Sequence, residues 1–195
     1  STRMHLLAAR AGFAVLYPEQ DRLANGHGCW NWHETRNGRA YTEAALIMQA
    51  VEQACTLHGG DRARVAIAGL SAGAGMAAVV AARYPERFRA VAMHSGVPPG
   101  TADSTVSALR AMAGRGSTDA LAVSPEEMAA QWPALLVIQG GADTVVAPRN
   151  GEAAALSWAR AAGAAAHTMR SVRRGRRHAM EVTDYKVRGR TVATL

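Results

Sequence analysis

The sequence predicts a single-domain α/β fold with a mostly parallel sheet and helices on both faces. Short apolar runs alternate with amphipathic helical stretches along the chain, which favours this fold class. In addition, a serine between two glycines stands where one such run passes into a helix. The chain has 195 residues, of which 49% are apolar, so it can bury a sizeable core. Residues 1–195 are therefore treated as one domain.

The first expected elements lie in the N-terminal third of the chain. A helical pattern begins at Met4, and the apolar run 13–17 predicts a buried strand closed by a proline. Residues 19–40 are rich in Gly, Asn and Asp and predict a long surface loop. The stretch 42–58 predicts a helix that a Gly-Gly pair ends. Its expected apolar stripe consists of Ala45, Leu46, Met48, Val51, Ala54 and Cys55.

The middle third predicts three strands of the sheet. Residues 65–70 are rich in Val, Ala and Ile and form the second expected strand, and a helix of small residues follows at 72–83. Residues 90–94 and 134–138 are the third and fourth strands. Between them, residues 97–132 carry Pro, Gly, Ser and Thr without strong periodicity, which predicts an excursion over one edge of the sheet.

The C-terminal third predicts one helix and three further strands. The helix covers 152–162, and the strands cover 167–172, 180–187 and 190–195. The last two strands are joined through Arg188-Gly189. The chain stops inside this last β-prone run, and we therefore expect it to be a segment of a longer domain.

Charge and cysteine usage narrow the classes of partner. The formal charge is +7, but the arginines are scattered except in the stretch 173–177, so we expect no nucleic-acid partner. No apolar run reaches the length of a membrane-spanning helix, so no membrane partner is expected either. Cys29 and Cys55 show no metal-binding spacing, and we expect neither a metal nor an organic cofactor.

A nucleophile motif is the strongest chemical signal. Residues 69–73 read Gly-Leu-Ser-Ala-Gly, which matches the Gly-x-Ser-x-Gly elbow of serine hydrolases. In such an elbow Ser71 stands on a strained strand-to-helix turn, and the flanking glycines let the backbones pass without a Cβ clash. The amide of Ala72 would open the helix and donate to an oxyanion. The alternative interpretation is a glycine-rich turn that carries an ordinary serine.

Asp143 is the candidate acid of a catalytic triad. It lies in a loop directly after the expected strand 134–138, where the order serine, acid, histidine places the acid. There it would orient the imidazole of the base. The alternative is an aspartate that forms an Asx turn and caps the next helix. Asp103, Asp119 and Asp184 fit the order less well.

The base is harder to place. Only His167 and His178 follow Asp143, and a triad histidine belongs on a loop after the final strand. His167 begins a strand, and His178 leads into one. We therefore expect the base beyond Leu195, with His178 as the in-chain candidate.

Several motifs occur in one order that resembles a known family. These motifs are Cys29-Trp30-Asn31-Trp32, Gly69-Leu70-Ser71-Ala72-Gly73, Tyr84-Pro85-Glu86, His94-Ser95-Gly96, Gly141-Ala142-Asp143-Thr144 and Val182-Thr183-Asp184-Tyr185. From about Thr2 to Leu195 the sequence thereby resembles the poly(3-hydroxybutyrate) depolymerase family of esterases, related to feruloyl and acetylxylan esterases. The chain departs from the family at Gln139, where a histidine is usual.

The resemblance implies an α/β-hydrolase fold and a serine esterase that acts on a polyester or a small ester. It places Trp30 and Trp32 near the mouth of the active site, whereas aromatic residues also anchor long loops onto a domain. It favours an extracellular location. Two alternatives remain: a feruloyl or acetylxylan esterase, and a non-catalytic binding module that acts through the arginine stretch 173–177.

Overall fold

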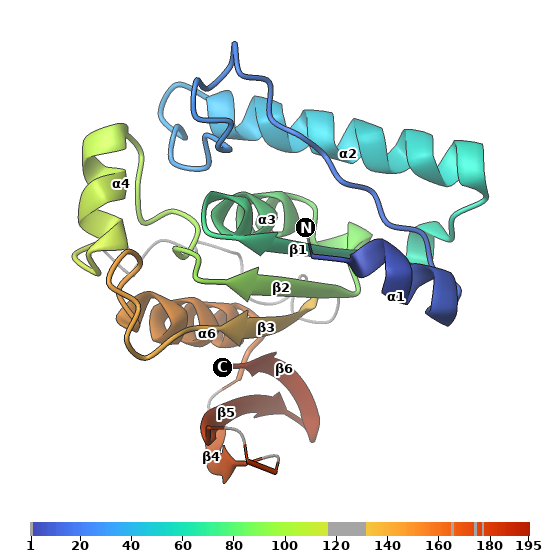
Figure 1. The fold of residues 1–195 in the computed structure, drawn as a ribbon. Coiled ribbons are helices and arrows are strands. Elements are labelled where there is room, and N and C mark those ends of the chain that lie inside the picture. The colour runs from blue at the N-terminus through green and yellow to red at the C-terminus, as the bar shows by residue number, and fades with distance from the viewer. Residues whose placement is uncertain (1, 117–131, 165, 174, 177) are drawn as a thin grey trace.

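Six strands form one sheet in the order β1-β2-β3-β6-β5-β4 (Figure 1). The computed structural model describes residues 2–116, 132–164, 166–173, 175–176 and 178–195. Four neighbouring strands run parallel to one another, and two further strands extend the sheet in an antiparallel manner. The parallel strands are β1 (Ala66–Leu70), β2 (Ala90–His94), β3 (Ala134–Ile138) and β6 (Arg190–Thr194). The other two are β5 (Met180–Val187) and β4 (Ala166–Val172).

The longest described helices are α2 (Arg39–His58), α3 (Ala72–Arg83) and α6 (Arg149–Ala161). Helix α3 packs on β1 and β2, α6 packs on β3 and β6, and α2 packs on α3. Shorter helices are α1 (Met4–Ala11) and α4 (Thr105–Met112), and the 3-10 turns are η1 (Arg62–Arg64) and η2 (Pro85–Arg87). No helix in the described ranges is long and apolar enough to cross a membrane.

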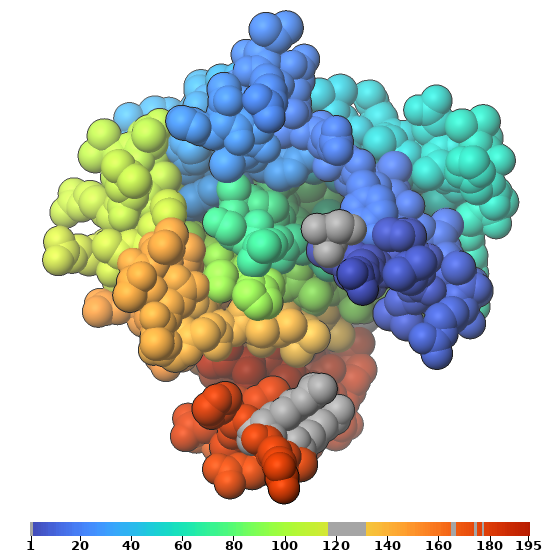
Figure 2. All heavy atoms as spheres, in the orientation of Figure 1, coloured from blue at the N-terminus to red at the C-terminus, as the bar shows by residue number. Residues whose placement is uncertain are grey.

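Helices α3 and α6 share one face of the sheet. On that face Val91 and Met93 of β2 are paired in register with Leu135 and Val137 of β3, and all four are buried. On the opposite face Leu136 and Ile138 are 44% and 48% exposed, and Leu70 of β1 is 63% exposed. Figure 2 shows this face between the blue N-terminal segment and the red C-terminal strands. The predicted mostly parallel α/β fold is thus confirmed. The face that carries Leu70, Leu136 and Ile138 is covered less than the predicted helices on both faces would imply.

The run 13–17 is not a strand, contrary to the prediction from its apolar residues. Phe13, Leu16 and Tyr17 are 44%, 44% and 51% exposed. Strand β1 is the edge strand of the sheet, so the run 13–17 does not extend the sheet beyond it. A strand needs a neighbour that accepts and donates its backbone hydrogen bonds, and this run pairs with none in the described residues. Apolar composition alone therefore gave the wrong element here.

Three helices differ from their predictions, and one of them is α6, which begins three residues before the expected residue 152 and ends at Ala161. Helix α4 lies within 97–132, where no element was predicted, and it begins at a capping box of Ser104 and Ser107. Residues 117–131 of that stretch lie outside the described residues. Helix α2 begins three residues earlier than expected, after Gly38 in the left-handed conformation (φ 79°). Its buried stripe also differs, since Leu46 is 57% exposed. The buried residues of α2 are Ala40, Glu43, Ala44, Ile47, Met48 and Cys55.

Candidate active site

The carboxyl ends of β1, β2 and β3 bring the candidate residues to one edge of the sheet. Because the strands are parallel and Leu70, His94 and Ile138 are in register, the residues that follow them meet at this edge. The amide of Ser71 donates to the carbonyl of His94 at 2.9 Å, and the amide of Ser95 donates to the carbonyl of Ile138 at 3.0 Å. The sheet register thus places the start of α3 next to the end of β2.

Ser71 has the strained backbone expected of a nucleophile elbow. Its φ of 53° and ψ of −121° lie outside the regions that non-glycine residues ordinarily occupy, and the residue is exposed. A Cβ atom on Gly69 would lie 2.1 Å from the carbonyl oxygen of Gly73, so only glycine fits at position 69. A Cβ atom on Gly73 would meet only Cδ1 of Trp30, at 4.0 Å. The close approach therefore requires the first glycine of the motif, and it does not require the second.

The amide of Ala72 is available to a ligand by its position. Ala72 is the first residue of α3, so its N–H has no carbonyl acceptor within the helix. The helix N-terminus also carries a partial positive charge, which favours an anion at this point. This geometry suits an oxyanion donor beside Ser71.

Asp143 lies in the turn after β3 and is held by three donors. Its Oδ1 accepts hydrogen bonds from the amides of Val145 and Val146, both at 2.9 Å, and its Oδ2 accepts one from Nε2 of Gln139 at 3.2 Å. The Val146 amide, the Val145 amide and the Ser95 hydroxyl lower the pKa of Asp143. The carboxylate is therefore charged at neutral pH.

The alternative interpretation of Asp143, an aspartate that forms an Asx turn and caps the next helix, holds for the turn and not for the cap. The two amide bonds are those of an Asx-type turn, yet α6 begins at Arg149 without any side-chain cap. The aspartate thus stabilises its own turn and does not cap the helix. Turn formation uses Oδ1, while Oδ2 accepts a hydrogen bond from Nε2 of Gln139.

The other aspartates are engaged elsewhere. Asp103 pairs with Arg36, and hydrogen bonds from Ser107 and then Arg36 are the main causes that lower its pKa. Asp184 on β5 accepts a hydrogen bond from Thr194 at 2.7 Å and also pairs with Arg170. Asp119 lies outside the described residues.

Neither histidine that follows Asp143 is brought to Ser71. His178 precedes β5, which stands four strand positions from β1, or about 19 Å at the usual strand spacing. His167 lies on β4, one strand farther, and both side chains are exposed. Strand β6 pairs in parallel with β3, so its carboxyl end points toward the same edge of the sheet as that of β3.

The two tryptophans of the N-terminal loop differ in their surroundings. Trp32 is 7% exposed, and its ring would lie 2.9 Å from a Cβ atom on Gly75, so it packs tightly against α3. Trp30 is half-buried and lies beside Gly73, in the first turn after Ser71. Trp32 therefore anchors the loop and presents little surface to a substrate, whereas Trp30 keeps an accessible part near Ser71.

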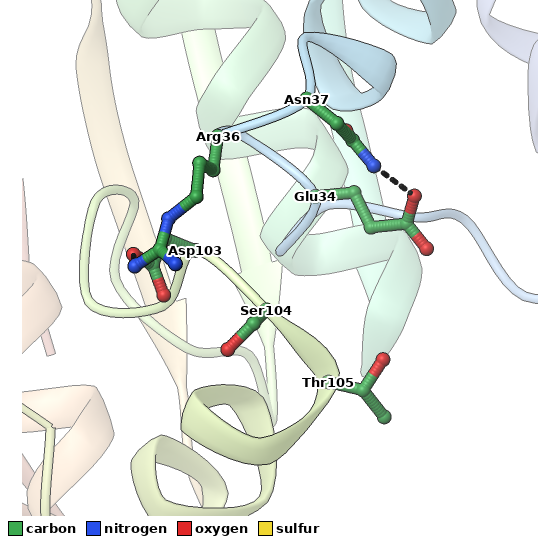
Figure 3. Close-up of a pocket in the computed structure, with 6 residues that line it drawn as sticks. All are labelled: Glu34, Arg36, Asn37, Asp103, Ser104 and Thr105. Atoms are coloured by element: carbon green, nitrogen blue, oxygen red, sulfur yellow. Dashed lines mark hydrogen bonds and ion pairs between the residues drawn. The ribbon is translucent and has the colours of Figure 1, made fainter.

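A polar hollow lies between the same loop and the start of α4 (Figure 3). Its volume is about 370 Å³, and the Arg36–Asp103 ion pair and the Asn37–Glu34 hydrogen bond line it. None of its lining residues belongs to the Ser71 edge of the sheet. In the part of the chain that the structure describes, no cluster of three or more His, Cys, Asp or Glu side chains could hold a metal ion.

The fold and the strained serine define a protein of the α/β-hydrolase class. Acetyl xylan esterase from Aspergillus awamori has a similar structure, with a TM-score of 0.64 and 20% sequence identity over all of this chain and 74% of that chain. The particular family follows from sequence comparison. The chain belongs to the Esterase PHB depolymerase family, which matches residues 1–183. This is a family of carboxylic ester hydrolases.

Characterised relatives cover more than one kind of ester. The chain is 41% identical over 101 residues to poly(3-hydroxyalkanoate) depolymerase C of Paucimonas lemoignei, which covers 51% of this chain and 24% of that protein. It is 27% identical over 168 residues to acetylxylan esterase A of Aspergillus awamori, with coverages of 78% and 54%. It is also 27% identical over 175 residues to feruloyl esterase B of Thermothelomyces thermophilus, with coverages of 83% and 59%. The chain thus spans less than two thirds of each of these relatives.

Proposed function

We propose that the protein is a serine esterase that hydrolyses short-chain polyhydroxyalkanoate esters through an acyl-enzyme. The observation that carries this proposal is the strained backbone of Ser71, which presents its hydroxyl at the sheet edge that also holds the charged Asp143. Membership of an esterase family supports the reaction class.

The reaction would begin with attack of Ser71 Oγ on the ester carbonyl. The proton of Ser71 passes to a histidine base, the amide of Ala72 stabilises the developing oxyanion, and the base then protonates the leaving alcohol. Water next attacks the acyl-enzyme in the same way and releases the acid. Asp143 holds the imidazole in the correct tautomer through its Oδ2, since Oδ1 is occupied by the turn amides.

We place the base on the chain that follows Leu195. The topology supports this proposal, because β6 runs parallel to β3, with Thr194 paired with Leu136, so that chain beyond Leu195 would leave the sheet toward the edge that carries Ser71 and Asp143. His178 would have to cross the width of several strands to reach Ser71.

The relatives of this chain suggest two substrate classes, a hydroxyalkanoate ester and an acylated sugar. The 41% identity to the poly(3-hydroxyalkanoate) depolymerase favours a hydroxyalkanoate ester, whereas the longer matches to acetylxylan and feruloyl esterases favour an acylated sugar. Comparing kcat/KM on hydroxybutyrate oligomers with that on acetylated xylan and feruloyl sugar esters separates them. A higher value on either sugar ester would overturn the hydroxyalkanoate assignment.

The nucleophile is tested by Ser71→Ala in the full-length protein. Hydrolysis of a chromogenic butyrate ester should fall by several orders of magnitude, toward the residual rate that oxyanion donors and binding supply. Ser157→Ala on α6 is the matched control, because its hydroxyl only donates to the carbonyl of Ala154. Undiminished hydrolysis by Ser71→Ala would refute the assignment. Failure of an organophosphonate to label Ser71, together with salt-sensitive polyanion binding, would favour the binding module instead.

A further inference from the structure

A buried carboxylate lies beneath the loop that carries the two tryptophans. Glu43, in the first turns of α2, is 5% exposed, and Asn31, between Trp30 and Trp32, is 3% exposed. The backbone amide of Asn31 donates to Oε2 of Glu43 at 2.8 Å, and its side-chain Nδ2 donates to Oε1 at 2.6 Å. One carboxylate therefore fixes both the backbone and the side chain of the residue between the tryptophans.

Two further side chains, Asn25 and Arg39, take part in this contact. Oδ1 of Asn31 accepts from Nδ2 of Asn25 at 2.9 Å, and Nε of Arg39 lies 3.7 Å from Oε1 of Glu43. A buried charge is costly unless hydrogen bonds and an opposite charge compensate it, and here both are present. Apolar contacts alone could hold a loop against α2 and α3. A charged bidentate contact adds direction, because it fixes the angle at which the loop meets the helix.

The direction matters because of what stands next to Asn31. Trp30 lies beside Gly73 in the turn that follows Ser71, and Trp32 packs against Gly75 two residues farther along α3. A rotation of the Asn31 peptide would therefore move the accessible part of Trp30 relative to the nucleophile. In the described residues the loop has no helix or strand of its own before α2, so its shape depends on such contacts.

We propose that Glu43 is a positioning residue that sets the orientation of Trp30, and thereby the binding of the acyl chain of the substrate. The proposal rests on the esterase function proposed above. Glu43 touches no substrate and takes no part in proton transfer; it acts through Asn31 on the neighbouring tryptophan.

A pair of substitutions tests the proposal sharply. In Glu43→Gln, one of the two Asn31 donors faces an amide NH₂ group, so one buried hydrogen bond is lost. In Asn31→Asp, two carboxylates face each other. In the double variant Asn31→Asp/Glu43→Gln, the amide at position 43 accepts from the backbone N–H at 31 and donates to the new carboxylate. That carboxylate still accepts from Asn25, so every hydrogen bond is restored with one of them reversed.

Two readouts distinguish positioning from simple loss of stability. For a butyrate or longer-chain ester, each single variant should raise KM by about tenfold, which is the effect of one unmade buried hydrogen bond, with kcat within about twofold. An acetate ester should be affected little. Quenching of tryptophan fluorescence by acrylamide, corrected with Trp30→Phe, should increase in both single variants. The double variant should return both readouts toward the parent values.

The control is Arg36→Gln, which breaks the exposed ion pair that ties the outer part of the same loop to Asp103. It should leave KM and quenching unchanged. The proposal is overturned if the single variants lower kcat and leave KM alone, if quenching does not change, or if the double variant shows no recovery. If the parent protein hydrolyses no ester, the esterase function fails, while the quenching series still decides whether Glu43 positions Trp30.

Discussion

Replacing Gly69 by alanine should damage the elbow far more than replacing Gly73. A Cβ atom at position 69 would lie 2.1 Å from the oxygen and 2.2 Å from the carbonyl carbon of Gly73, and 2.5 Å from the nitrogen of Ala74. Ordinary contacts between such atoms are about 3.5 Å, so α3 must move away from β1 by roughly 1.4 Å. Both partners are backbone, and α3 is otherwise buried, so no flexible side chain can absorb the shift.

The cost should appear in both stability and turnover. Overpacking a well-packed core costs about 1–3 kcal/mol, and a clash between backbones belongs at the upper end, so Gly69→Ala should lose about 3 kcal/mol of unfolding free energy. The same shift moves Ser71 and the Ala72 amide, and a misplacement of about 1 Å can lower turnover by about 10²-fold. Urea unfolding and kcat for a butyrate ester measure the two effects.

Gly73→Ala is the matched control, because its Cβ atom has 4.0 Å to the nearest atom of Trp30. Alanine is favoured over glycine in a helix by up to about 1 kcal/mol, so this variant should unfold at the parent midpoint or above it. Equal losses of stability in the two variants would refute the steric argument. A Gly69→Ala protein that unfolds like the parent would do the same.

Three further substitutions test the remaining assignments. Asp143→Asn should lower kcat by about 10⁴-fold through the wrong imidazole tautomer, and equal damage from Asp103→Asn would contradict that assignment. His178→Ala should leave turnover within about threefold of the parent. A fall in turnover of about 10²-fold or more, which is what a general base contributes, would instead identify His178 as the base. Asp184→Asn should cost about 1–3 kcal/mol at pH 7, since Thr194 and then Arg170 lower the carboxyl pKa. Because that pKa lies below its unfolded value, the loss should shrink as the pH falls below about 4, and a pH-independent loss in urea unfolding would contradict the argument.

The elements with sharp sequence boundaries were predicted well. Helix α3 and strands β2 and β3 begin and end where their apolar runs meet Ser71, Ser95 and Gln139, because these junctions are turns in the structure. The run 13–17 failed because strand formation depends on a pairing partner, and a single sequence does not show one. Helix α4 was missed because its start is a pair of serines that cap it, and its apolar residues are few.

The candidate site residues that belong to recognisable sequence motifs could be predicted, and the others could not. The elbow and the aspartate after the next-but-one strand follow a fixed order, so Ser71 and Asp143 could be singled out, although their roles stay predictions. Glu43 was missed because the apolar stripe of α2 was centred on the wrong residues. The signal was present: Glu43 is in phase with Ala40 and Ile47, at the spacing of one helix face. A charged residue on the buried face of a helix indicates a polar partner, here Asn31.

The geometry of the candidate site depends on the sheet more than on its loops. Ser71 and Ser95 each follow a strand, each has a positive φ (53° and 50°), and each donates its amide to the last carbonyl of the next strand. The same combination of a positive φ and an amide hydrogen bond to the neighbouring strand therefore occurs twice, once between β1 and β2 and once between β2 and β3. It leads from Ser71 to Ser95, whose hydroxyl is one of the groups that lower the pKa of Asp143. Because these contacts are made by backbone atoms of registered strands, the spacing of Ser71 and Asp143 can survive changes in the surrounding side chains, such as Gln139 where the family usually has histidine. Substrate preference, by contrast, should vary with the loop that carries Trp30, which is held by side chains.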